Sequence, residues 1–360
     1  MTRFERDSVR RMQGYRWGEQ PEDARTIKLN TNENPHAPSP AVARALAALD
    51  VADLRRYPSP FANGFRDAAA AVHGVPRDWI IATNGGDELL RLALTTFLEP
   101  GQPLATTAPS YSLYPVLASV QGSPTIEYPL DADFALPEDL GERANAAGAG
   151  LFCLVNPHAP SGRLFDLDAV DALARSFEGV LLLDEAYVDF VDPALGHDAT
   201  RLLARHDNLL ILRSLSKGYA LAGLRFGYGL GQAELIEPML TKTRDSYNVD
   251  LIAQRLATAA VEDRSWAEQN WAAVRRERTR LTAALRDLGC EVPASQTNFV
   301  LARLPAGCDA RAVQQRLREA RVLVRWFDTE GLRDRLRISV GTPEEDDRLL
   351  ELLSATLVPA

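Results

Sequence analysis

The feature of the sequence that most limits its fold is an alternation of short apolar runs with amphipathic segments between about residues 79 and 230. The clearest apolar runs are 79–82, 151–155, 180–183 and 209–212. Strands that are apolar nearly throughout are typical of a parallel sheet covered by helices on both faces. We therefore predict an α/β fold, built from repeated βα units around a mainly parallel sheet.

Polar residues or glycines follow each of these four runs at once. The four segments in question are Asn84-Gly85-Gly86, Asn156-Pro157, Asp184-Glu185 and Ser214-Leu215-Ser216-Lys217. Open α/β sheets bind their ligands at the carboxyl ends of the strands. We therefore expect the four loops to converge on one functional site.

The remaining chain predicts a second, smaller unit, which suits a length of 360 residues. Residues 251–288 form a long helical pattern without Pro or Gly, and we expect this helix to bridge the two units. Beyond it, strand patterns at 297–304 and 336–340 alternate with helical patterns at 310–320 and 343–357, as in a small α+β domain. The predicted division is an N-terminal arm at 1–45 that joins the small domain, a large ligand-binding domain at 46–265 and a small C-terminal domain at 266–360.

Composition excludes several classes of protein. Hydrophobic residues make up 46% and charged residues 25%, as in ordinary globular domains, and no apolar run is long enough to span a membrane. Residues 1–7 lack the apolar stretch of a secretion signal, so we expect a cytoplasmic protein. Three widely spaced cysteines indicate neither a disulfide framework nor a metal site. A net charge of −9 argues against a nucleic-acid partner.

Amine chemistry has few candidates, because only Lys28, Lys217 and Lys242 among 40 basic residues are lysines. Lys217 follows an apolar run, and a lysine at a strand end can form a Schiff base with an aldehyde cofactor. A lone lysine is more often a solvated surface residue. Asp184 favours the cofactor, because a carboxylate that closes a buried strand needs a cation such as a pyridinium nitrogen. A helix cap is the structural alternative for Asp184.

A phosphate site is indicated on the same rim. Gly85 and Gly86 precede an amphipathic run at 88–97, and N–H groups at a helix start favour a phosphate that glycines allow to approach. Many ordinary turns share this pattern, so the glycines alone are a weak signal. Ser214, Ser216 and Arg225 would complete the phosphate site with two hydroxyls and a guanidinium.

Together these motifs resemble the fold-type I aminotransferases, which depend on pyridoxal 5'-phosphate (PLP), and within them the histidinol-phosphate aminotransferases. The resemblance runs in order along nearly the whole chain, through residues 29–35, 56–58, 184–187, 214–225 and 336–341. It implies that the large domain binds PLP. It also implies transamination of L-histidinol phosphate with 2-oxoglutarate, which gives imidazole acetol phosphate and L-glutamate in histidine biosynthesis.

The resemblance implies a role for each residue around the cofactor ring. Lys217 would carry PLP as an imine and shuttle the proton, Asp184 would pair with the pyridinium nitrogen, and Tyr187 would donate a hydrogen bond to the phenolic oxygen. Tyr111 would stack on the ring, unless it is simply a core aromatic residue.

The phosphate and substrate contacts are implied in the same way. Gly85, Gly86, Ser214, Ser216 and Arg225 map to phosphate contacts. Tyr57 maps to a residue that reaches the phosphate of the neighbouring subunit, which would require a homodimer with a shared active site. Substrate contacts would come from Arg325, Arg337 and Tyr15.

One position departs from the pattern of the family. Relatives carry an Asn just before Pro-Thr-Gly, where this chain has Ala159 before Pro160-Ser161-Gly162. The missing amide would have donated to the phenolic oxygen, and its loss is expected to raise the pKa of the imine. His158 and Asn156 are the nearby polar residues considered as replacements.

Three other functions stay open at this level. A guanidinium fork suits a phosphate or a carboxylate equally, so an aromatic amino acid aminotransferase or a decarboxylase of phosphorylated amino acids on the same fold is an alternative. A PLP-binding regulatory protein without turnover is motivated only by Ala159. A nucleotide-binding enzyme is disfavoured, because the chain lacks a Gly-x-x-x-x-Gly-Lys-Ser/Thr loop. We expect small-molecule substrates as partners, and neither nucleic acid nor membrane.

Overall fold

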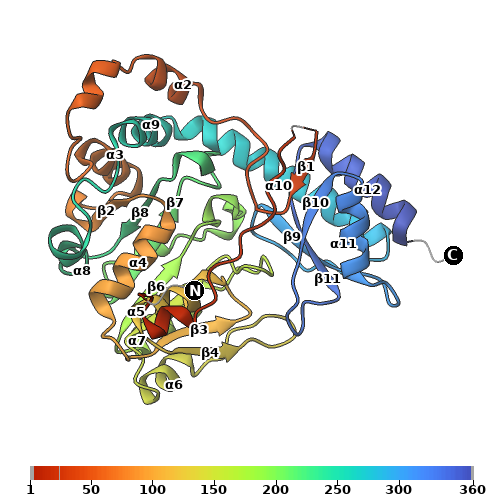
Figure 1. Ribbon diagram of the computed structural model, residues 1–360, viewed down its shortest axis with the longest axis horizontal. Coiled ribbons are helices and arrows are strands. Elements are labelled where there is room, and N and C mark those ends of the chain that lie inside the picture. The colour runs from red at the N-terminus through yellow and green to blue at the C-terminus, as the bar shows by residue number, and fades with distance from the viewer. Residues whose placement is uncertain (1–3, 24, 358–360) are drawn as a thin grey trace.

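Two sheets organise the protein in a computed structural model that describes residues 4–23 and 25–357 (Figure 1). The larger sheet has seven strands in the order β2-β8-β7-β6-β5-β3-β4. Their bounds are β2 Ile80–Thr83, β3 Leu104–Ala108, β4 Thr125–Pro129, β5 Leu151–Val155, β6 Val180–Asp184, β7 Leu209–Ser214 and β8 Gly227–Leu230. The four predicted apolar runs are β2, β5, β6 and β7, and the prediction of a mainly parallel α/β fold is confirmed.

One strand of this sheet departs from the parallel pattern. β8 runs antiparallel to both of its neighbours, β7 and β2. No α-helix lies between β7 and β8; the connection holds only the short 3-10 helix η6, Ala222–Leu224. Parallel strands need a long crossover, whereas a short loop joins antiparallel strands, so the reversal follows from this connection. The sequence patterns did not predict β3, β4 or β8.

Helices pack on both faces of the large sheet. Their bounds are α3 Asn63–His73, α4 Gly86–Phe97, α5 Leu113–Gln121, α6 Leu140–Ala146, α7 Leu167–Ser176, α8 Ala233–Pro238 and α9 Leu251–Glu262. Alternate residues of β6 belong to different hydrophobic clusters: Leu181 and Leu183 to one, Leu182 to the other. Since successive side chains of a strand point to opposite faces, both faces of the sheet are covered, as the apolar runs predicted.

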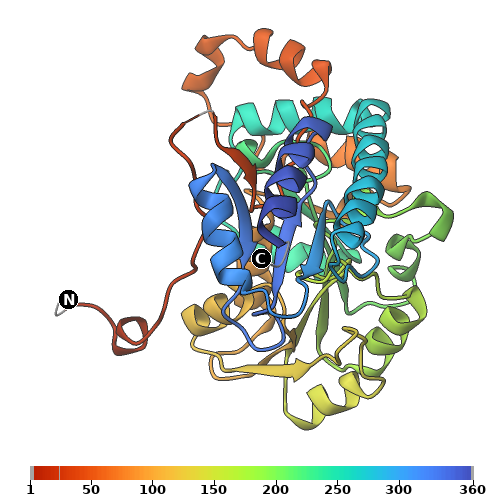
Figure 2. The same ribbon diagram turned by 90° about the vertical axis from the view of Figure 1, so that its right-hand side faces the viewer.

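The smaller sheet has four strands in the order β1-β10-β11-β9, with α11 and α12 packed near it (Figure 2). The bounds are β1 Ile27–Leu29, β9 Phe299–Arg303, β10 Val322–Trp326, β11 Arg335–Ser339, α11 Ala310–Glu319 and α12 Pro343–Leu357. β1 is a segment from the start of the chain and pairs in parallel with β10. The domain boundaries at 45/46 and 265/266 stay predictions.

The long helix expected over residues 251–288 is instead two helices, α9 and α10, the second spanning Arg264–Asp287. They meet at Asp263, whose backbone leaves the helical region at φ −97° and ψ 48°. Its carboxylate accepts hydrogen bonds from the hydroxyls of Ser39 and Ser265. Asp is one of the weaker helix formers, so a break at this residue needs neither Pro nor Gly.

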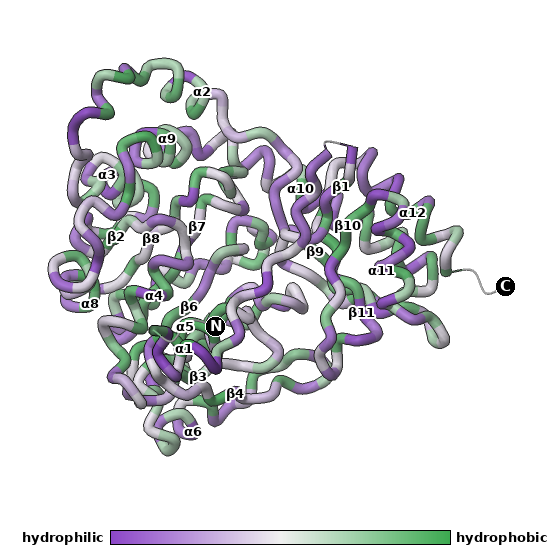
Figure 3. Tube along the Cα trace, viewed as in Figure 1, coloured by the Kyte–Doolittle hydropathy of each residue, from purple (hydrophilic) through white to green (hydrophobic). Residues whose placement is uncertain are grey.

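The remaining elements are short or peripheral. They are α1 Asp7–Arg10, α2 Pro40–Ala47, η1 Val51–Arg55, η2 Arg77–Trp79, η3 Val188–Phe190, η4 Pro193–Leu195, η5 Ala199–Leu202 and η7 Met239–Thr243. Figure 3 shows hydrophilic and hydrophobic residues interleaved along the outer helices, as expected of helices with one buried face. No helix within the described residues is long and apolar enough to cross a membrane.

Candidate active site

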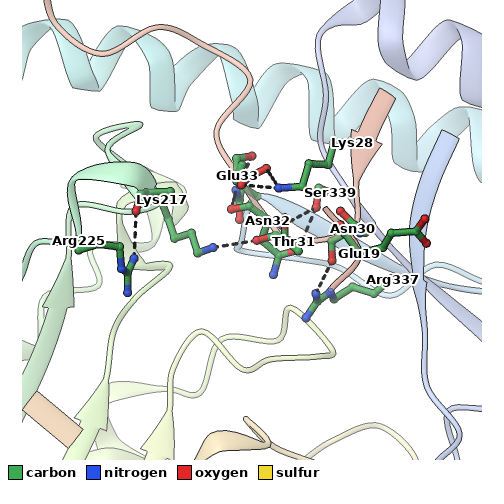
Figure 4. A network of polar contacts seen from close by, with 12 residues as sticks. Glu19, Lys28, Asn30, Thr31, Asn32, Glu33, Lys217, Arg225, Arg337 and Ser339 are labelled. Atoms are coloured by element: carbon green, nitrogen blue, oxygen red, sulfur yellow. Dashed lines mark hydrogen bonds and ion pairs between the residues drawn. The ribbon is translucent and has the colours of Figure 1, made fainter. Parts of the chain in front are cut away.

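Lys217 follows β7 and is partly buried at the junction of the two sheets (Figure 4). Its Nζ donates a hydrogen bond to Thr31 O at 2.9 Å. Burial, together with the positive charge of Arg337, lowers the pKa of Lys217 to about 8. About a tenth of the amine is therefore unprotonated at pH 7, far more than for an ordinary lysine, and this is the form that attacks an aldehyde.

Asp184 closes β6 and is 4% exposed. Its carboxylate accepts hydrogen bonds from Tyr114 Oη at 2.7 Å and from Ala186 N at 3.1 Å. Burial raises its pKa to about 6, and among the described residues no cation forms an ion pair with it. The hydrogen bond from Ala186 N resembles the helix cap considered as the structural alternative for Asp184. It uses only one of the two carboxylate oxygens, Oδ1. The structure thus leaves a buried carboxylate without a counter-charge, as a pyridinium site requires.

Tyr187 lies three residues beyond β6, with its ring edge-on to Phe299 at 5.1 Å between centroids. Its Oη accepts a hydrogen bond from Asn32 Nδ2 at 3.0 Å. Burial raises its pKa, so the phenol keeps its proton and can donate it in a hydrogen bond.

The predicted phosphate contacts gather around the start of α4. Gly85 precedes the helix at φ +79°, and a Cβ added there would lie 2.7 Å from Arg225 Nη2. Arg225 Nη1 in turn donates to Ser216 Oγ at 3.4 Å, and Ser216 N donates to Ser214 Oγ at 3.1 Å. Gly86 is the first residue of α4. Helix N–H groups, hydroxyls and a guanidinium, the last 3.7 Å from Asp87 Oδ2, thus gather where an anion could bind.

The two predicted substrate arginines face each other across the small sheet. Arg325 in β10 is the register partner of Arg337 in β11, and both guanidiniums lie about the Phe327 ring at 5.4 Å. Arg337 Nη2 donates to Asn30 O at 3.0 Å, while its Nε is buried without a partner. Neither arginine forms an ion pair with a carboxylate of residues 4–23 or 25–357. Two uncompensated guanidiniums make a site for an anion.

The three predicted tyrosines have different surroundings. Tyr111 packs edge-on to Tyr114, the partner of Asp184, at 5.4 Å, and Tyr15 packs edge-on to Tyr111 at 5.9 Å. Tyr57 instead stacks on Tyr247 and is 80% exposed. Tyr15 and Tyr111 therefore belong to a series of packed rings that ends at Tyr114, the partner of Asp184, whereas Tyr57 lies on the surface.

The position that lacks the family's amide is apolar in the structure. Ala159 is buried in a small cluster with Val155, Phe299 and Tyr187. Both side-chain atoms of Asn156 are used by the backbone of Phe165. The His158 ring nitrogens lie 2.7 Å from Ser161 Oγ and 2.8 Å from Pro109 O. Neither neighbour is therefore free to replace the missing donor.

Several residues that contact the predicted site residues were not predicted from the sequence. Tyr114 bonds to Asp184, Thr31 to Lys217, and Asn32 to Tyr187. Figure 4 shows Thr31 and Asn32 on the segment that enters from the small sheet, beside the ion pair in which both oxygens of Glu33 lie 2.6 Å from Lys28 Nζ. The spacing of Tyr114 three residues after Tyr111, on one helix face, was a usable signal.

The geometry fits PLP at each end of that molecule. The Lys217 amine suits the aldehyde, the uncompensated Asp184 suits the pyridinium nitrogen, and the cup around Gly85 suits the phosphate. Ser110 Oγ, next to Tyr111 in sequence, is buried without a partner, which adds one unused polar atom.

Comparisons with known proteins agree with this geometry. The family model described as aminotransferase class I and II matches residues 24–353, and the chain belongs to that family. The chain is 41% identical to histidinol-phosphate aminotransferase 1 of Trichormus variabilis, over 98% of this chain and 99% of the relative. It is likewise 41% identical to the histidinol-phosphate aminotransferase of Chromohalobacter salexigens, over 99% of both chains. The resemblance drawn from the motifs is thereby confirmed.

Solved structures show the same likeness. The histidinol-phosphate aminotransferase of Sinorhizobium meliloti, in complex with pyridoxal-5'-phosphate, superposes with a TM-score of 0.84 at 26% identity, covering 92% of this chain and 89% of that one. A putative aminotransferase of Burkholderia pseudomallei has a TM-score of 0.78 at 31% identity, covering 92% and 98%. The prediction of a fold-type I aminotransferase architecture is confirmed.

Proposed function

We propose that the chain is a PLP-dependent enzyme that transfers the amino group of L-histidinol phosphate to 2-oxoglutarate, in histidine biosynthesis. The products are imidazole acetol phosphate and L-glutamate. The observation that carries the cofactor is a half-buried Lys217 amine just after β7, together with a buried carboxylate, Asp184, that closes the neighbouring strand β6 and has no counter-cation among the described residues. The names of full-length relatives at 41% identity favour this substrate over an aromatic amino acid.

Each residue of the site has a role in this reaction. PLP supplies an electron sink that weakens the Cα–H bond of the amine substrate. Lys217 would hold the cofactor through its aldehyde and would then move the proton between the substrate Cα and the cofactor C4′ carbon. Asp184 would hold the proton on the pyridine nitrogen, and Tyr187 would donate to the phenolic oxygen. Tyr111 would pack against the ring.

The two ends of the bound molecules meet different anion sites. Gly85, Gly86, Ser214, Ser216 and Arg225 bind the cofactor phosphate through N–H groups, hydroxyls and a guanidinium. Arg325 and Arg337 bind the phosphate of histidinol phosphate and, in the second half of the reaction, a carboxylate of 2-oxoglutarate. A planar fork can pair with either group, which allows one pocket to serve two substrates. Tyr15 contacts the substrate from the N-terminal arm.

The enzyme is proposed to be a homodimer with a shared site. Tyr57 then reaches the phosphate of the neighbouring subunit, which agrees with its 80% exposure here. Val51, Leu54 and Trp17 are also exposed apolar residues, and Figure 2 shows the N-terminal segment extending away from the body of the protein. Apolar surface of this kind is what a partner subunit covers.

The location and the domain division complete the proposal. All three cysteines are free thiols, which fits a reducing compartment such as the cytoplasm. The arm at 1–45 joins the small domain through β1, the large PLP-binding domain covers 46–265 and the small domain covers 266–360.

A single-turnover experiment tests the function. The purified, cofactor-loaded protein is mixed separately with L-histidinol phosphate, L-phenylalanine and L-glutamate, and the loss of the visible cofactor band is followed. We expect L-histidinol phosphate and L-glutamate to discharge the band, the former faster. Discharge by phenylalanine alone would reassign the substrate. A band that no amine discharges would indicate a regulatory protein.

A further inference from the structure

Asn32 is a buried residue in the turn that carries the chain from β1 into the site. It is 2% exposed and has φ 56°, a left-handed conformation that asparagine tolerates better than most residues. Its backbone N donates to Ser339 Oγ at 2.9 Å, and its backbone O accepts from Asn298 Nδ2 at 2.9 Å. The small domain therefore fixes Asn32 on both sides of its Cα.

The orientation of the Asn32 side-chain amide follows from Ser339. Ser339 Oγ already accepts from Asn32 N, and its single proton is donated to Asn32 Oδ1 at 3.0 Å. The oxygen of the amide is thereby assigned to Ser339. Asn32 Nδ2, which can only donate, faces Tyr187 Oη at 3.0 Å.

A donor at this place controls the direction of the Tyr187 proton. Because Tyr187 Oη accepts from Asn32, its own hydroxyl hydrogen has to point elsewhere, and the ring is held by Phe299 and Ala159 on its apolar sides. Accepting one hydrogen bond also polarises a hydroxyl and strengthens the bond that it donates.

We propose that Asn32 is a positioning residue that keeps Tyr187 as a hydrogen-bond donor toward the cofactor's phenolic oxygen, and that it compensates for the amide missing at position 159. The inference rests on the proposed function, in which Tyr187 makes that contact. The compensation is indirect: the family's amide would donate to the oxygen itself, whereas Asn32 strengthens the remaining donor.

The same turn connects Tyr187 to the substrate arginines. Ser339 and Arg337 are two residues apart in β11, so their side chains lie on one face of the strand, and Arg337 donates to Asn30 O. The strand that holds Asn32 therefore also carries Arg337.

The test measures the pH midpoint of the visible absorption of the bound cofactor, which reports the proton on its imine nitrogen. Asn32→Gly removes the amide while glycine accepts φ 56°. We expect the midpoint to rise by roughly half a pH unit, because the phenolate is less well held. Tyr187→Phe should raise it further. In the Tyr187→Phe background, Asn32→Gly should add almost nothing, since there is no hydroxyl left to orient.

Asn32→Asp is a second variant that keeps the shape of the side chain and the contact with Ser339. Its carboxylate would accept the Tyr187 proton and withdraw it from the cofactor, so the midpoint should rise more than with glycine. The new charge also acts directly on the imine. Only the part of the midpoint shift that disappears in the Tyr187→Phe background is therefore attributed to the orientation of the Tyr187 hydroxyl.

The charged neighbours of the site are unchanged in all of these variants. Tyr187 faces Arg337, Asp184 and Tyr15, while Lys217 faces Arg337, Glu33, Arg225 and Lys28.

Asn30→Ala is the matched control, because this residue lies in the same turn and its amide bonds to Glu19 O rather than to Tyr187. Its midpoint should equal that of the unmodified protein.

Different outcomes distinguish a failure of the positioning role of Asn32 from a failure of the proposed function. An unshifted midpoint in Asn32→Gly, or an equal shift with and without the Tyr187 hydroxyl, would overturn the positioning role while leaving the proposed function in place. An unmodified protein without a cofactor band would overturn both.

Discussion

Two adjacent carboxylates at the end of β6 have opposite surroundings. Glu185 forms an ion pair with Arg213 at 2.7 Å and lies 3.3 Å from His197 Nε2. Asp184 has a tyrosine hydroxyl and a backbone N–H, and no cation among the described residues. The charge of Glu185 is compensated by an arginine of the chain, whereas the charge of Asp184 needs a cation from outside the chain. Burial is shared by both residues, so compensation of charge distinguishes a structural cluster from a ligand site.

The largest effect is expected from a substitution in the uncompensated region, at Lys217. Lys217→Ala removes the only amine at the centre of the site, and we expect the transamination rate to fall by about 10⁴-fold or more. Thermal stability should change little, since no carboxylate of residues 4–23 or 25–357 lies within hydrogen-bond distance of Lys217. The rate is measured by single turnover. Lys242→Ala, at an exposed lysine, is the control and should retain the full rate.

The two carboxylates are compared directly by Asp184→Asn and Glu185→Gln. Asp184→Asn should lower kcat by about 10² to 10³-fold, because the pyridine nitrogen loses the group that keeps it protonated. Glu185→Gln should leave kcat within a few-fold. It should lower the free energy of unfolding by about 3 kcal/mol, because it leaves Arg213 buried without a partner. The reverse pattern would refute the distinction between the regions.

A pH prediction follows for the protein stripped of PLP. Burial raises the pKa of Asp184 from 3.8 to about 6, so the folded state binds this proton more tightly than the unfolded state. The stability contributed by that proton is fully present below pH 3.8 and is lost as the pH rises through 6. The apoprotein should therefore lose on the order of 2–3 kcal/mol across this window relative to Asp184→Asn. Denaturant titrations of both proteins check this, and parallel curves would contradict it.

Arg337→Lys probes the uncompensated charge on the substrate side. Lysine keeps the charge but cannot form two parallel hydrogen bonds, so we expect KM for the phosphorylated amine to rise by about 10 to 100-fold. The change in kcat should be smaller than the change in KM. Steady-state kinetics measure both, and Arg333→Lys on the surface provides the control, since Arg333 pairs with Asp328.

Tyr57→Phe should have the smallest effect and extends the comparison across the subunit boundary. Removing one hydroxyl contact to a phosphate is expected to weaken cofactor binding by about 3 to 10-fold. The Kd for PLP is measured by fluorescence. In a dimer of one Tyr57→Phe subunit and one unmodified subunit, the site that the intact Tyr57 reaches should recover the full affinity for PLP. This recovery would support the shared active site. A Kd equal to that of the unmodified protein would argue against it.

Much of the fold was predictable because its strands are apolar on both faces. β5, β6 and β7 are visible as runs of buried Leu, Ile and Val, and the polar residues after them lie at the predicted edge. β3 was less visible, since Thr106 and Thr107 interrupt its hydrophobic pattern. The hydrogen bond between Ser39 and Asp263, at the break between α9 and α10, joins residues 224 positions apart, and no local pattern contains that contact.

The site divides in the same way. Lys217, Asp184 and Arg225 were predictable, because each lies in or next to a motif of typical spacing. The contact of Asn32 with Tyr187 joins residues 155 positions apart, and it exists only because β1 has joined the small sheet. Register across the small sheet also places Arg325 beside Arg337, a pairing that sequence suggested only through the resemblance.

The bidentate ion pair between Lys28 and Glu33 has a consequence for how the protein is labelled. Of the three lysines in the chain, one is engaged by this carboxylate, one lies on the surface, and only Lys217 combines burial with a pKa near 8. A dilute aldehyde reagent followed by borohydride should therefore mark Lys217 in preference to the other two lysines. That preference among the lysines would allow a probe to be attached at the reactive centre without prior mutagenesis.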